Sequence, residues 1–110
     1  MNNQRQQKIN HLIQKDLGEI FLHEVIIPNT MVTVTYINIT PDMSVARVNL
    51  SIFAVNDKQT ALKQIKQRTK EIRTLLAQRI KNQLRIIPEL QFFLDESLDK
   101  AERINELLKS

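Results

Sequence analysis

The chain has 110 residues, no cysteine and one glycine, and its hydrophobic and charged fractions of 42% and 25% are typical of a folded globular domain. These features exclude a disulfide framework, a thiolate metal site and glycine-rich phosphate loops, and no apolar run is long enough to cross a bilayer. The net charge of +4 conceals an uneven distribution, because residues 58–88 carry nine Lys and Arg and a single acid, Glu71. We therefore expect one domain with one strongly basic segment.

Hydrophobic periodicity predicts the elements of the first half. Apolar residues at helical spacing predict an amphipathic helix over residues 3–23, and residues 25–30 are typical of a loop. The β-branched and aromatic run at residues 32–39 predicts a strand. Its apolar residues change from even to odd positions halfway along the run, which indicates either a β-bulge or burial on both faces. After a turn at residues 40–43, the alternation at residues 46–52 predicts a second strand, antiparallel to the first.

The basic segment begins as a helix that Asn56 or Asp57 can cap. Its apolar positions continue to Leu84, but the six residues 66–71 between them are polar. Two alternatives follow. The segment is either one long helix whose apolar face is interrupted by this polar patch, or two helices joined by a short junction with the patch at the surface.

The helix is expected to end at Ile86-Ile87-Pro88, because the residue before a proline avoids the α region. Alternation at residues 90–94 predicts a third strand, and Ser97 can cap a last amphipathic helix. The predicted order is therefore α-β-β-α(α)-β-α. The predicted core includes Ile72, Leu76, Ile80, Val48, Leu50 and Phe92.

No side chains form a recognisable catalytic arrangement. His11 and His23 lie on the same predicted helix, about 18 Å apart along its axis, too far to share an ion or a proton. Asp95, Glu96 and Asp99 cluster at a predicted helix start, where acids complement the helix dipole. The serines have no base at a recognisable spacing. We expect no enzyme activity, no catalytic or metal-ligating residue, no cofactor and no small-molecule substrate.

The basic segment is the positive signal for function. Clustered Lys and Arg beside a three-stranded sheet are typical of a nucleic-acid-binding surface, and the alternative is a solvated helix face without a partner. Arg68, Lys70 and Arg73 surround the polar patch, and Lys63 and Lys66 lead into it. Because the chain has few aromatic residues, a platform of stacked aromatic side chains is not expected.

Four stretches of the chain, residues 5–21, 31–53, 71–93 and 95–108, carry a resemblance to a known family. The most specific pieces are Pro41-Asp42 leading into Ala46 and Val48, the pair Ile72-Arg73, and Arg85-Ile86-Ile87-Pro88-Glu89-Leu90 followed by Phe92. In these pieces, their order and their spacing, the sequence resembles ribosome-binding factor A, a family of bacterial small-subunit assembly factors.

The resemblance implies an α+β fold, a single type II KH-like RNA-binding domain over residues 1–110. Its order would be α-β-β-α-α-β, with a three-stranded sheet packed against helices and a short C-terminal helix. It implies binding to 16S rRNA in the free 30S ribosomal subunit, in support of late 30S maturation and 16S rRNA 5′-end processing, without catalysis. We expect a cytoplasmic monomer, and the polar amino terminus agrees with that location. The alternative is a basic protein-interaction module that docks on an acidic protein partner.

Members of that family carry Ala-X-Gly just before the Ile-Arg pair, where this chain has Arg68-Thr69-Lys70. Without the glycine, we infer that the site relies more on charge and less on close backbone approach. The predicted RNA-binding residues are Lys63, Lys66, Arg68, Lys70, Arg73, Arg79, Lys81 and Arg85, with Arg5 and Lys8 widening the surface. Exchanging Arg68, Lys70 and Arg73 for Glu is expected to reduce RNA affinity and leave the melting temperature nearly unchanged.

Overall fold

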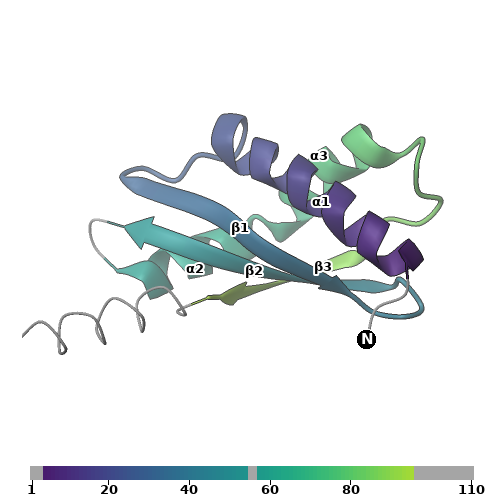
Figure 1. Ribbon diagram of the computed structural model, residues 1–110. Helices are drawn as coiled ribbons and strands as arrows, with labels where there is room; N and C mark the ends of the chain where they lie inside the picture. The colour runs from purple at the N-terminus through teal and green to yellow at the C-terminus, as the bar shows by residue number, and fades with distance from the viewer. Residues whose placement is uncertain (1–3, 55–56, 96–110) are drawn as a thin grey trace, which may run out of the picture.

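A computed structural model of the chain describes residues 4–54 and 57–95. The elements are α1 (Gln4–His23), β1 (Thr30–Ile39), β2 (Val45–Ala54), α2 (Lys58–Gln67), α3 (Thr69–Ile80) and β3 (Glu89–Leu94). Their order, α-β-β-α-α-β, confirms the expected fold class (Figure 1). The helix expected after Ser97 lies outside the described residues.

The three strands form one mixed sheet in the order β1-β2-β3. β1 and β2 are antiparallel, as predicted, and β3 runs parallel to β2. The register between β1 and β2 shifts between Val34 and Tyr36, so the parity change in the sequence is a β-bulge. Because of the bulge, Val34 and Ile37 are both buried on the helix-covered face of β1, although they are three residues apart.

The helices pack on one face of this sheet and enclose the core. α1 contacts β1, α2 contacts β2 and β3, and α3 lies beside α1 (Figure 1). All six predicted core residues, Ile72, Leu76, Ile80, Val48, Leu50 and Phe92, are buried. The opposite face exposes alternate residues of each strand, including Tyr36, Phe53 and Phe93. None of the helices within residues 4–54 and 57–95 is apolar over enough of its length to cross a membrane.

Three amide side chains at four-residue spacing tie α1 to the backbone of β1. Gln6 Nε2 donates to the carbonyl of Ile39 at 3.2 Å, and Asn10 Oδ1 accepts from the Ile39 N–H at 2.8 Å. Gln14 Nε2 donates to the carbonyl of Thr35 at 3.1 Å and to that of the preceding residue at 3.2 Å, at the bulge. Residues four apart lie on the same face of a helix, so the three amides form one row along β1.

Asp57 is the N-cap of α2, which settles the choice between the two predicted caps. Its carboxylate accepts hydrogen bonds from the backbone N–H of Gln59 at 3.0 Å and from the hydroxyl of Thr60 at 2.9 Å. These bonds, the Gln59 bond foremost, favour the charged form and hold the pKa of Asp57 below its ordinary value.

We expect Asp57 to make the folded state acid-sensitive. Because its pKa is lower in the folded chain, its stabilising contribution is complete above the ordinary Asp value of about 4. That contribution is lost as the pH falls through the lowered pKa. Asp57→Asn keeps a capping oxygen without the charge, so the melting temperature of this variant should fall less steeply with acid. Melting curves of both proteins across acidic pH test this, and parallel curves would contradict it.

The end of α3 differs from the prediction. The helix ends at Ile80 rather than at Ile86-Ile87-Pro88, and the Ile80 carbonyl accepts from the N–H groups of Gln83 at 2.8 Å and Leu84 at 3.1 Å. Leu84 continues the apolar period of the helix but packs against the core from outside it. Its packing position explains why the sequence pattern extends past the end of the helix.

Candidate nucleic-acid interface

A single residue, Arg68, separates α2 from α3. Its backbone has φ −100° and ψ 14°, its N–H donates to the carbonyl of Ile65 at 3.0 Å, and its carbonyl accepts from the N–H of Ile72 at 2.9 Å. Any L-residue can adopt this negative φ, so the chain breaks the helix without a glycine. The alternative of two helices with a short junction is confirmed.

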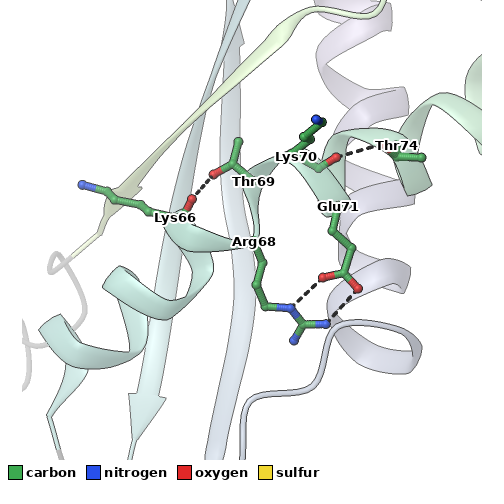
Figure 2. Close-up of polar contacts among 6 residues, drawn as sticks. All are labelled: Lys66, Arg68, Thr69, Lys70, Glu71 and Thr74. Carbon is green, nitrogen blue, oxygen red and sulfur yellow. Dashed lines mark hydrogen bonds and ion pairs between the residues drawn. The ribbon is translucent and has the colours of Figure 1, made fainter.

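Side chains around Arg68 stabilise the junction. The Thr69 hydroxyl donates to the carbonyl of Lys66 at 2.7 Å. The Arg68 guanidinium donates twice to the Glu71 carboxylate, at 2.8 and 3.1 Å, as Figure 2 shows. This pairing lowers the pKa of Glu71 and raises that of Arg68. Arg68 is therefore already paired within the chain and is less available to a phosphate than its sequence position indicates.

Lys66 and Lys70 flank the junction on either side of Arg68. Both are exposed, and Figure 2 shows their side chains extending away from the Arg68–Glu71 pair. Lys63, about one turn earlier on α2, is exposed as well. Within residues 4–54 and 57–95, none of the three ammonium groups forms an ion pair. These three residues, which we call the junction lysines, are the cations that this part of the structure leaves available.

A shallow depression connects the junction with the third strand. It is lined by Lys66, Thr69, Leu90, Gln91, Phe92 and Phe93. Phe92 is buried in the core, whereas the next residue, Phe93, is 44% exposed. The low number of aromatic residues predicts no stacking platform, but strand alternation beside a core Phe92 indicates an outward Phe93. The structure therefore places an exposed aromatic ring and a lysine on the border of one depression.

The Arg73 side chain is hydrogen-bonded within the fold. Its guanidinium donates to the backbone carbonyls of Ile87 at 2.7 Å and Pro88 at 3.1 Å. These bonds attach the connection between α3 and β3 to the helix. We therefore expect a substitution of Arg73 to destabilise the fold, so the triple exchange would not test RNA binding alone.

Arg79 also points to acids of its own chain. It forms ion pairs with Asp16 at 3.2 Å, with Glu19, and with Glu24 at 3.7 Å. All three acids belong to α1 or follow it directly, so Arg79 links α3 to α1. Because three carboxylates surround its guanidinium, Arg79 attracts a phosphate only weakly.

The remaining predicted cations lie away from the junction. Lys81 and Arg85 follow α3, whose 12 residues span about 18 Å. Arg5 and Lys8 lie in the first two turns of α1. Arg5 and Arg85 border the same pocket, which Lys8 and Lys81 do not line. The predicted site residues thus fall into the junction lysines, three internally bonded arginines, and cations at the far end of α3.

The described part of the chain offers no metal centre. Within residues 4–54 and 57–95, no three His, Asp or Glu side chains lie close enough together to hold an ion. The three acids around Arg79 are paired with its guanidinium.

Comparison with known proteins gives consistent matches over nearly the whole chain. The family model of ribosome-binding factor A matches residues 5–108. Ribosome-binding factor A of Cytophaga hutchinsonii is 44% identical over 98% of this chain and 83% of its own length. That of Flavobacterium johnsoniae is 42% identical over 98% of this chain and 85% of its own.

Solved structures share the fold. The crystal structure of ribosome-binding factor A from Thermus thermophilus superposes with a TM-score of 0.69 at 21% identity, over 81% of this chain and 94% of that chain. A homology model of the Thermus thermophilus factor, fitted into a cryo-electron microscopy map of its complex with the 30S subunit, superposes with a TM-score of 0.65 at 22% identity. It covers 79% of this chain and 91% of that one.

Proposed function

This chain belongs to the ribosome-binding factor A family, and we propose that it binds 16S rRNA in the free 30S ribosomal subunit. There it assists late maturation of the subunit and processing of the 5′ end of that RNA. It acts by binding, without catalysis, as a monomer in the cytoplasm. The observation that carries the proposal is the set of three exposed junction lysines around the helix break.

The junction lysines suit a phosphate backbone better than a single anion. Lys63 and Lys66 lie one turn apart on α2 and Lys70 lies in the first turn of α3, so the three exposed cations are spread over both sides of the helix break. Each phosphate that a lysine neutralises releases condensed counterions, which makes binding favourable at low salt. The Arg68–Glu71 pair fixes the junction without adding net charge.

Phe93 gives the same surface a contact for bases. Aromatic rings beside a basic path stack on unpaired bases, and stacking contributes roughly 1–3 kcal/mol per base. Phe93 shares its depression with Lys66, so one nucleotide can place its phosphate on the lysine and its base on the ring. This arrangement favours single-stranded RNA over an acidic protein, whose carboxylates need no aromatic contact.

Salt-dependent co-sedimentation with purified 30S particles tests the proposal. We expect binding at low salt, with the logarithm of affinity falling by roughly 0.7 for each phosphate contact per tenfold rise in salt. Three junction lysines therefore predict a slope near −2. Failure to co-sediment with immature or free 30S particles at low salt would contradict it. Selective capture of an acidic ribosomal protein, with no RNA crosslink, would support the alternative of a protein-interaction module.

A further inference from the structure

A second recessed site lies at the end of the molecule that holds the start of α1, the β1–β2 turn and the connection after α3 (Figure 1). It is a pocket of about 340 Å³. Two of the stretches singled out in the sequence, Pro41-Asp42 and Arg85-Ile86, meet there although they are more than forty residues apart. The junction lysines do not line it, so the surface proposed above does not account for it.

The pocket combines an apolar floor with a cationic rim. Ile9 and Ile39 are buried beneath it, and Ile86 is 74% exposed at its side. Arg5 and Arg85 are both exposed at the border. Within residues 4–54 and 57–95, neither guanidinium forms an ion pair. Two unpaired guanidinium groups above apolar carbon are suited to a ligand that is both anionic and flat or apolar.

Asp42 adds a hydrogen-bond acceptor to the same pocket. Its Oδ1 accepts from the hydroxyl of Thr40 at 2.7 Å, and from the hydroxyl and N–H of Ser44 at 2.8 and 3.2 Å. These bonds lower the pKa of Asp42, so the carboxylate stays charged. Its Oδ2 receives no hydrogen bond from the described part of the chain. One fixed, charged acceptor therefore remains for a ligand.

We propose that this pocket holds one unpaired nucleotide of an RNA strand, an inference that rests on the proposed function. The phosphate lies between Arg5 and Arg85, and the base lies on Ile86 and the buried isoleucines. An exocyclic amino group of the base donates to Asp42 Oδ2. An acidic peptide fits less well, because it offers carboxylates to the two guanidinium groups but no flat ring to the isoleucine side chains. Uracil, which has no exocyclic amino group, would place a carbonyl there instead.

Amide NMR of the full chain locates the contact. We expect a short single-stranded oligoadenylate to shift the amide signals of Met43, Ser44 and Ile86 in addition to signals at the helix junction. AMP should produce the same shifts only at much higher concentration, because the strand also contacts the junction lysines. Ribose 5-phosphate, which lacks the base, should leave the amide of Ile86 unmoved.

Variants separate the pocket from general electrostatics. Arg5→Gln with Arg85→Gln should weaken oligoadenylate binding about a hundredfold, because each substitution removes one charge-assisted contact worth about tenfold. The control, Lys8→Gln with Lys81→Gln, removes the same charge from neighbouring positions outside the pocket and should have a smaller effect. Asp42→Asn keeps an oxygen for Thr40 and Ser44 but presents an amide, so it should reduce the preference for oligoadenylate over oligouridylate.

The outcomes distinguish this inference from the proposed function. Shifts confined to the junction, with normal 30S binding, would overturn the pocket and leave the proposed function standing. Absence of both RNA and 30S binding would overturn both. AMP binding as tightly as the oligonucleotide would indicate a site for free nucleotide, and pocket shifts with an acidic peptide alone would indicate a protein site. Either result contradicts the inference.

Discussion

Exchanging Lys66 and Lys70 together for Glu is expected to weaken binding to the 30S particle by about a hundredfold, because each lost charge-assisted contact is worth about tenfold. The melting temperature should stay nearly unchanged. Lys66 lies in the last turn of α2 and Lys70 in the first turn of α3, so the two new acids have opposite effects on the helix dipoles. Co-sedimentation across a salt series and thermal melting measure the two quantities.

A second double variant controls for net charge. Lys15→Glu with Arg47→Glu makes the same change in total charge, but Lys15 lies on α1 and Arg47 on β2, outside the proposed surface. We expect this control to lose much less affinity and to keep the slope of affinity against salt, whereas the junction variant should lose about 1.4 units of slope, roughly 0.7 for each of its two lysines. Equal losses for the two double variants would show that only the overall charge matters.

Replacing Arg73 with Ala is expected to destabilise the fold by about 1–2 kcal/mol, which corresponds to a fall of roughly 5–10 °C in the melting temperature. The variant loses both hydrogen bonds to the carbonyls of Ile87 and Pro88. Pro88 is fully buried, so its carbonyl is poorly placed to find water instead. Thermal melting and denaturant titration measure the loss.

Two further substitutions show whether the loss comes from these hydrogen bonds. Arg73→Lys keeps a charge and can reach one carbonyl, so its stability should lie between those of Arg73→Ala and the natural chain. Lys70→Ala, an exposed position on the same helix, should change stability by less than about 0.5 kcal/mol. Wild-type stability in Arg73→Ala would mean that the two bonds contribute nothing, and that Arg73 is free to act as an RNA contact.

The elements of the fold could be predicted because each has a strong local period. The sequence alone does not distinguish the β-bulge from burial on both faces. Both fit the change in apolar alternation between Val34 and Ile37, and only the register with the partner strand identifies the bulge. The end of α3 was predicted too late, because Leu84 has helical spacing although it packs from a turn. The hydrophobic pattern predicts which side chains are buried, but it does not predict whether a buried residue belongs to a helix or to a turn.

Charge counting predicts which segment of the chain binds RNA, but it does not show which of its cations are available. Three arginines of that segment are bonded inside the fold. Glu71 is three residues from Arg68, so that pair could have been read from the sequence. The partners of Arg79 lie on α1 or directly after it, and those of Arg73 are backbone carbonyls after α3. Both sets are distant in sequence, so neither leaves a local signal.

The row of amides on α1 has a consequence for how the sheet meets other chains. β1 is an edge strand, and exposed edges invite further strands to add and begin aggregation. Gln6, Asn10 and Gln14 occupy backbone groups of β1 at both the bulge and the far end. A strand added to this edge would have to displace these hydrogen bonds, so α1 protects the edge of the sheet against strand addition. These bonds therefore lower the tendency of β1 to pair with a strand of another chain.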